Sequence, residues 1–189
     1  MAVSFKVEDA FQEEEIIQAL NEIAQPVEIA VWNTSNYFNF GGLIRTCHNF
    51  AVRKMWGIDL WKDPESPLTK PYYKRAAMTA HKWMKQNIHC VTSEEFLSKV
   101  EGRNIVAFER REGIDSEDIR SFEYPDNPIL LFGSEKDGIP DHLMVAAQSV
   151  VSIPVMGFCL DFNLAQAASI AIYDWTLKNT NPNFGKSND

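Results

Sequence analysis

Three short stretches of the chain each follow an apolar, strand-like run and lead through a glycine-containing loop to a helix-like run. They are residues 39–45, 132–140 and 153–163. In an open α/β fold this junction lies at the carboxyl edge of the sheet, which is where ligands bind. Each stretch also places glycine near a charged or amide side chain, so the backbone can approach a ligand closely beside a polar group. The three stretches therefore predict one shared site.

Short apolar runs alternate with helical patterns along the chain, which predicts a single α/β domain with a largely parallel sheet flanked by helices. The expected strands are 27–32, 52–60, 104–108, 128–132 and 150–153. The expected helices are 8–24, 41–51, 93–100 (with Ser93 as N-cap), 141–148 and 163–178. We divide the chain into an N-terminal amphipathic helix at 1–25, a core domain at 26–178 and a polar tail at 179–189.

The composition excludes several classes of protein. The chain has 189 residues, 45% of them hydrophobic, which is enough for one domain with a sizeable core. There is no run of about eighteen apolar residues, so no transmembrane helix is expected. The acidic N-terminus lacks the basic start and apolar core of a secretory signal, so we expect a cytoplasmic protein. The three cysteines and four histidines show no ligand spacing, so neither a disulfide framework nor a metal site is expected.

Positive charge is concentrated in one part of the chain. The net charge is −8, which taken alone argues against a nucleic-acid partner. Residues 41–85, however, hold nine of the eighteen lysines and arginines and only three acidic residues, with tryptophan and tyrosine between them. This composition suits RNA binding through backbone charge and base stacking. A solvated basic surface that balances acids elsewhere explains it equally well.

The first stretch offers Asn39 and Arg45. We expect Arg45 on the early turns of a helix that begins near Gly41, where a guanidinium can clamp a phosphate with paired hydrogen bonds. Asn39 can donate to and accept from a sugar hydroxyl or a neighbouring carboxylate. An asparagine cap followed by a surface arginine is the simpler interpretation of this spacing alone.

The second and third stretches add a carboxylate and a loop. Glu135 follows a buried strand, and a buried carboxylate needs partners; Arg45 and backbone amides are the candidates. No phosphate-binding glycine motif is present, so nucleotide phosphate binding is not expected. In the third stretch, residues 157–162 form an apolar loop whose backbone groups can hold an adenine edge, and Asn163 caps the last helix. A turn, a linker and a cap explain these features when each is taken singly.

Taken together, the three stretches resemble the SPOUT superfamily of RNA methyltransferases, and within it the SpoU/TrmH branch that methylates ribose 2′-hydroxyls. That branch carries Asn-x-Gly-x-x-x-Arg-Thr, present here as residues 39–46, and Phe-Gly-x-Glu-x-x-Gly, present as residues 132–138. It also carries Ile-Pro-Met-x-Gly followed by Ser-Leu-Asn and a long helix, which corresponds here to residues 153–157 and 161–178. Each of these three motifs is a weak signal alone, but their occurrence together in this order is specific to the family.

The resemblance implies a fold with a C-terminal trefoil knot, S-adenosylmethionine as cofactor, an RNA substrate, and a homodimer with the active site between subunits. It also implies roles for individual residues. The catalytic group would be Arg45, Asn39, Glu135 and Asn163, with Asp161 beside them. The cofactor would lie against Gly133, Ile153 and Phe162, with Phe132, Met156 and Gly157 as their neighbours. We expect tRNA rather than rRNA as substrate, because the chain is compact.

One departure from the family pattern leaves the activity open. The family's serine two residues before the last asparagine is Asp161 here, and an anionic carboxylate repels an RNA phosphate unless a cation neutralises it. Two alternatives to a ribose methyltransferase therefore remain. One is a SPOUT-fold RNA-binding or interaction protein with impaired catalysis, and the other is a SPOUT base methyltransferase.

Overall fold

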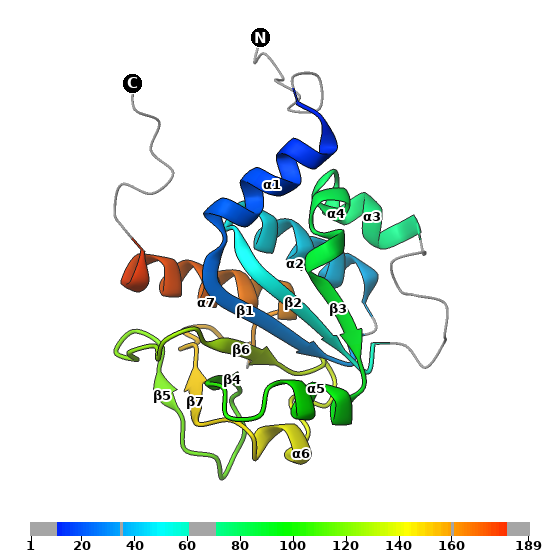
Figure 1. Ribbon diagram of the computed structural model, residues 1–189. Coiled ribbons are helices and arrows are strands. Elements are labelled where there is room, and N and C mark those ends of the chain that lie inside the picture. The colour runs from blue at the N-terminus through cyan, green and yellow to red at the C-terminus, as the bar shows by residue number, and fades with distance from the viewer. Residues whose placement is uncertain (1–10, 35, 61–70, 160, 181–189) are drawn as a thin grey trace.

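A seven-stranded sheet with helices on both faces forms the protein (Figure 1). The computed structural model describes residues 11–34, 36–60, 71–159 and 161–180. All neighbouring strands are parallel, in the order β3-β2-β1-β6-β4-β7-β5. The strands are β1 (Gln25–Trp32), β2 (Val52–Ile58), β3 (Ile88–Val91), β4 (Ile105–Phe108), β5 (Glu117–Asp118), β6 (Ile129–Phe132) and β7 (Ser149–Ser152). The predicted α/β fold with a parallel sheet is confirmed.

Two apolar layers cover the sheet, one on each face. The first face packs against α2 (Tyr37–Asn49), α3 (Pro71–Ala77), α4 (Ala80–Trp83) and α7 (Leu164–Asn179). The second face packs against α5 (Ser93–Lys99) and α6 (Asp141–Met144). In β1, Ile29 and Val31 belong to the first layer and Ala30 to the second. Burial on both faces explains why the central strands are continuous apolar runs.

Helices α2 and α7 lie side by side and run in the same direction. Three pairs of residues meet, one on each successive turn: Gly42 with Ala165, Thr46 with Ser169 through hydroxyls 3.1 Å apart, and Phe50 with Tyr173 through rings 6.3 Å apart. This register brings the N-termini of both helices to the same edge of the sheet. The first turn of α2 and the cap of α7 therefore meet.

The strand order changes direction between β1 and β6. The chain passes from β1 to β2 and β3 toward one edge, whereas β6 lies on the other side of β1 and pairs with β4. Val31 is opposite Phe132 at the carboxyl ends of β1 and β6. The loops after these strands diverge there, and this is the kind of place at which open α/β sheets bind ligands.

Several element boundaries differ from the sequence-based expectation. The prediction that a helix begins near Gly41 is wrong, because Asn36 caps α2 and its side chain accepts hydrogen bonds from the backbone of Phe38 and Asn39. Ser93 does not cap α5, because Thr92 forms the capping box with Glu95. The N-terminal helix is present as α1 (Glu13–Ile23), and α6 ends at Met144, earlier than expected. Strands β3 and β5, helices α3 and α4 and the short 3-10 helix η3 (Lys85–Asn87) were not predicted.

No helix among the described residues has both the length and the apolar character needed to cross a membrane. Within the same residues, no group of three or more His, Cys, Asp or Glu side chains is placed to hold a metal ion.

Candidate active site

Glu135 is the centre of a hydrogen-bonded network at the point where β1 and β6 diverge. Thr34, directly after β1, donates its hydroxyl to both carboxylate oxygens of Glu135, at 2.9 and 3.1 Å. Asn39, on the first turn of α2, donates its side-chain amide to the same carboxylate. Among the described residues, the donors to Glu135 are thus Thr34 and Asn39 and not the expected Arg45 or backbone amides. Neutral donors satisfy this carboxylate instead, which leaves it a negative charge to offer to a ligand.

Asn163 connects this network to helix α7. Its side-chain amide donates to the Asn39 carbonyl oxygen at 3.0 Å, and its own carbonyl oxygen accepts from the backbone of Ala165 at 3.0 Å. The predicted cap at Asn163 is thus confirmed. Because each of these two asparagines is held at both ends, residues from three distant parts of the chain take fixed orientations.

A cavity of about 430 Å³ opens beside the network. Pockets for small molecules generally fall between about 300 and 1,000 Å³. The residues of the expected site that line it are Phe132, Gly133, Glu135, Ile153, Asp161, Phe162 and Asn163. Its charged lining residues are four acids and three bases: Glu109, Glu135, Asp137, Asp161, Arg110, Arg111 and Lys136. The cavity therefore has both an apolar floor and a charged rim.

The wall of the cavity after β6 is held by a tight turn and a carboxylate. Gly133 cannot carry a side chain, because a Cβ there would lie 2.0 Å from the carbonyl carbon of Gly138. Ser134 and Gly138 exchange backbone hydrogen bonds of 3.1 Å. Glu109, after β4, accepts from the backbone of Ile139 at 2.8 Å. On the floor, the Phe108 and Phe132 rings stack 5.0 Å apart.

A family model described as "SpoU rRNA Methylase family" matches residues 26–173. The chain belongs to this family. The match covers the whole sheet and most of α7, so it includes every element that contributes to the network and the cavity. The resemblance seen in the three sequence stretches is confirmed.

Similar proteins agree with this assignment. A tRNA (guanosine(18)-2′-O)-methyltransferase of Thermus thermophilus is 24% identical over 160 residues, which are 84% of this chain and 78% of that protein. The A. aeolicus TrmH/SpoU tRNA modifying enzyme aligns with a TM-score of 0.72 and 22% identity, over 88% of this chain and 83% of that one. An AdoMet-bound rRNA methyltransferase from Sinorhizobium meliloti aligns with a TM-score of 0.71 and 24% identity, over 86% of this chain and 61% of that one.

Three residues of the expected site, one catalytic and two cofactor-binding, lie outside the network and the cavity. Arg45 is exposed on α2, and it forms no hydrogen bond or ion pair with the described residues. A helix turns by about 100° per residue, so Arg45 projects about 120° away from Asn39. Met156 and Gly157 are exposed and do not line the cavity. The roles implied for these three residues stay predictions.

Thr34 and Glu109 belong to the site of this SpoU-family chain but were not expected from the sequence. Thr34 is only 1% exposed, although its hydroxyl is polar. The signal that could have found both residues is their position, because each lies within two residues of the carboxyl end of an apolar strand. Such positions face the ligand edge in a parallel sheet.

Proposed function

We propose that this protein is an S-adenosylmethionine-dependent RNA methyltransferase that modifies a ribose 2′-hydroxyl, with tRNA as a more suitable substrate than rRNA. Membership of the family supports the class of reaction. The Thermus thermophilus protein, named for 2′-O-methylation of tRNA, supports the ribose as the methylated group and tRNA as the substrate. The observation that carries the proposal is the Thr34–Glu135–Asn39–Asn163 network beside a cavity large enough for the cofactor. With an RNA substrate, we keep the expectation of a cytoplasmic protein.

The cavity suits the cofactor in size and charge. When bound, S-adenosylmethionine supplies an electrophilic methyl on a positively charged sulfur. The molecule carries an ammonium, a sulfonium and a carboxylate, so its net charge is positive, whereas the charged lining residues are four acids and three bases. Phe132 and Ile153 offer apolar contact for the adenosine, and Gly133 leaves its backbone accessible. Glu135 and Asp161 would face the positive groups.

The chain's own residues then position the ribose and remove its proton. Asn39 holds Glu135 in place, so the Glu135 carboxylate, which lines the cavity, is positioned without reorganisation. A guanidinium is a poor base and a good phosphate ligand, so we assign Arg45 to the target phosphate and to orienting the hydroxyl. The proton passes to a phosphate oxygen or to the carboxylate of Asp161, which lines the cavity.

We further propose the trefoil knot and the homodimer that the family resemblance implies. The exposed faces of α2 and α7 support a dimer, because Phe38, Tyr173 and Leu177 are 60%, 54% and 64% exposed. Apolar side chains at this exposure favour a protein partner. A second copy on this face would also bring an Arg45 to each cavity. This matters because Arg45 points away from Asn39 and so from the network of its own protomer.

Calorimetry with S-adenosylmethionine, followed by transfer of a tritiated methyl group to bulk tRNA and rRNA and by nucleoside digestion, tests this function. We expect binding, and a labelled 2′-O-methylnucleoside from tRNA. Label on a base would instead assign a base methyltransferase. Cofactor binding without transfer to any RNA would identify an RNA-binding or interaction protein that has lost catalysis at Asp161.

A further inference from the structure

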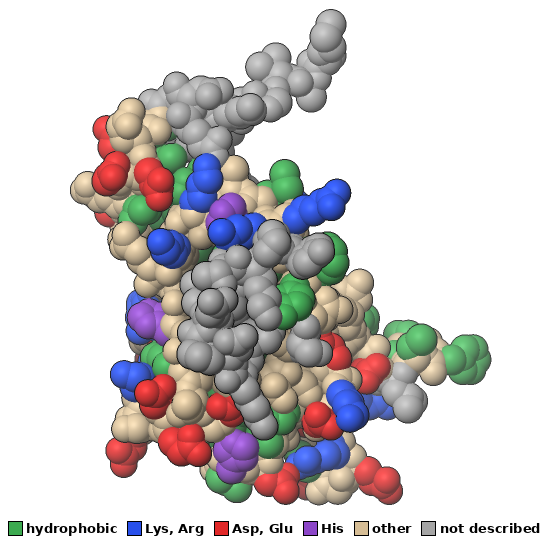
Figure 2. Space-filling model, turned by 90° about the vertical axis from the view of Figure 1, so that its right-hand side faces the viewer, with side chains coloured by type: hydrophobic (Ala, Val, Ile, Leu, Met, Phe, Trp, Pro, Cys, Tyr) green, Lys and Arg blue, Asp and Glu red, His purple; other side chains and the backbone are tan. Residues whose placement is uncertain are grey.

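One segment of the chain presents only basic charged side chains at the surface, although the chain as a whole is acidic. Residues 71–91, which form α3, α4, η3 and β3, contain four lysines and arginines and no aspartate or glutamate. Lys74, Arg75, Lys82 and Lys85 are all exposed. Figure 2 shows blue side chains gathered across the upper part of this face, with red side chains beside them at the upper left. We call these four residues the α3–α4 basic surface.

The α3–α4 basic surface adjoins helix α2, which carries Asn39 and Arg45. Helix α3 packs so closely on α2 that a Cβ on Gly41 would lie 2.3 Å from the carbonyl oxygen of Tyr73 and 2.8 Å from the Cβ of Ala76. Arg45 follows Gly41 by four residues, so it lies about 40° around α2 from the side that faces α3, toward the outward side. Lys74 and Arg75 are therefore exposed on the helix that packs next to the one carrying Arg45.

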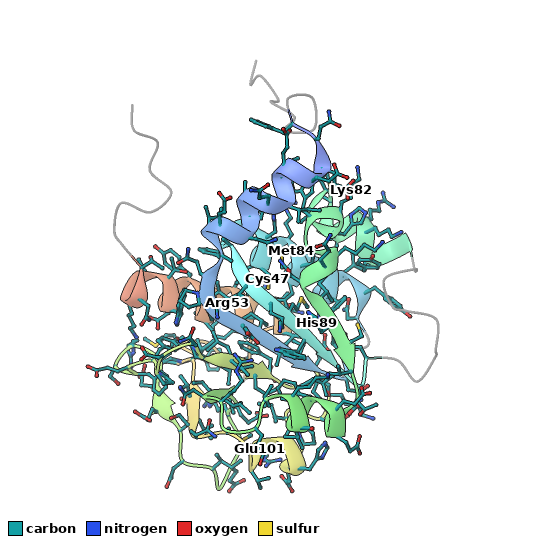
Figure 3. The ribbon with its side chains drawn as sticks, in the orientation of Figure 1. Cys47, Arg53, Lys82, Met84, His89 and Glu101 are labelled. Carbon is teal, nitrogen blue, oxygen red and sulfur yellow. The ribbon has the colours of Figure 1, made fainter. Side chains whose placement is uncertain are left out.

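Neighbouring groups leave most of this charge uncompensated. Lys74, Arg75 and Lys85 have no ion pair with any residue that the structure describes. Lys82 is different, because it lies on α4 next to α1 (Figure 3), whose first turn carries Glu13, Glu14 and Glu15. Like charges held close together repel one another unless a ligand of opposite charge neutralises them. Among the described residues, the uncompensated positive charge is therefore that of Lys74, Arg75 and Lys85.

We propose that the α3–α4 basic surface holds the phosphate backbone of the substrate RNA, away from the nucleotide that is methylated. This rests on the proposed function, because one RNA strand would have to contact both the α3–α4 basic surface and the methylation site at Arg45. Helix side chains that contact phosphates fix the register of an RNA without reading its bases. The same surface then explains how a chain of net charge −8 binds RNA at all.

The test measures the affinity of wild-type protein and variants for bulk tRNA across a series of salt concentrations. Each lost phosphate contact lowers the slope of log K against log salt by about 0.7 to 0.9. We expect Lys74→Ala/Arg75→Ala to lower this slope by about 1.5 and to weaken binding by about tenfold near 0.15 M salt. The charge-retaining variant Lys74→Arg/Arg75→Lys should keep the wild-type slope. The matched control Arg53→Ala/Lys99→Ala removes two exposed charges elsewhere and should change neither quantity.

Methyl transfer and cofactor calorimetry on the same variants separate this proposal from the function. A basic surface that only docks RNA raises the KM for tRNA, with kcat and the Kd for S-adenosylmethionine unchanged. Equal slopes for Lys74→Ala/Arg75→Ala and the matched control would overturn the docking surface, even with wild-type transfer intact. If instead the wild-type protein transfers no methyl group while its tRNA affinity still depends on Lys74 and Arg75, the docking surface stands and the methyltransferase function fails.

Discussion

Arg45 has a permanent positive charge, a position on the exposed side of α2, and no described partner. Its side chain is therefore free to hold a phosphate, and its removal leaves the cavity and the Glu135 network intact. We expect Arg45→Ala to lower methyl transfer at least about 100-fold, because one well-placed charged donor contributes that much to a transition state. Cofactor binding, measured by calorimetry, should change less than about twofold.

The conservative variant distinguishes geometry from charge at this position. Lysine keeps the positive charge but cannot form the paired hydrogen bonds of a guanidinium. Arg45→Lys should therefore recover only part of the lost activity. Near-normal turnover in Arg45→Ala would refute the role assigned to the arginine.

Asp161 is the residue at which this chain departs from its family, and it lines the cavity with an exposed carboxylate. We expect Asp161→Ser to keep methyl transfer within about fivefold, because the phosphate held by Arg45 can accept the proton in its place. The measurement is kcat for tRNA as a function of pH. A fall of about 100-fold or more, with an acidic limb lost from the pH profile, would make Asp161 the proton acceptor.

Adjacent glycines on α2 give a matched test of how the helices pack. A Cβ on Gly41 would strike the backbone of Tyr73 at 2.3 Å, whereas a Cβ on Gly42 would meet only Ala165, at an ordinary 3.9 Å. Gly41→Ala should lower the free energy of unfolding by about 1 to 3 kcal/mol, since α3 must move away. Gly42→Ala should leave it unchanged or raise it by up to about 1 kcal/mol through helix propensity. Denaturant unfolding measures both, and equal effects would contradict the close packing of α2 and α3.

His48, near the end of α2, makes stability depend on pH. Burial lowers the pKa of His48, and its ring lies 5.0 Å from that of Trp83. Since the folded state resists protonation, the unfolded state binds more protons as the pH falls through about 6.5, so stability declines toward acid. Burial and Lys54 also lower the pKa of His89, with the same sign.

The prediction concerns the interval between pH 7.5 and pH 5. Wild-type protein should lose stability across it, and His48→Phe, which keeps a ring against Trp83, should lose less. His48→Phe/His89→Gln should be nearly flat. Salt-bridged carboxylates such as Glu28 and Asp118 have lowered pKa values, so their effect appears mainly below this interval. A wild-type slope retained in the double variant would exclude both histidines as its cause.

The sequence predicted those elements whose pattern is strong and local. The buried run of β6 and the Asn163 cap of α7 were recognised because apolar continuity and capping are read directly from neighbouring residues. Strand β3 was missed because it is an edge strand of four residues in which His89 and Cys90 are exposed. Helices α3 and α4 are short and are stabilised by packing on α2 rather than by a pattern of their own.

Some members of the site were predicted, but not the contacts between them. Asn39, Glu135 and Asn163 were expected together, and the structure brings them together. That Asn39, rather than Arg45, contacts Glu135 depends on the angular positions of these two residues on α2, and Asn39 lies on this helix only because it begins at Tyr37 rather than near Gly41. A register of this kind follows from tertiary packing and not from spacing.

At the scale of the whole molecule, a single copy of the chain leaves the residues that we propose for catalysis on two surfaces. The cavity and Asn163 lie at the edge of the sheet, while Arg45 lies on the outward side of α2 near the exposed Phe38. In a two-fold dimer built on α2 and α7, the arginine of one protomer would complete the cavity of its partner. Variants at the two places must then complement each other.

We expect Arg45→Ala and Asn163→Ala to be inactive alone and to recover activity when unfolded together and refolded as an equal mixture. Half of the dimers are then mixed, and each mixed dimer has one site with neither substitution, so recovery should reach about a quarter of the wild-type rate. A site built within one protomer recovers nothing, because every site retains one lesion. The control Arg45→Ala mixed with Glu135→Ala should also recover, since Glu135 shares the network of Asn163, whereas Glu135→Ala mixed with Asn163→Ala should not.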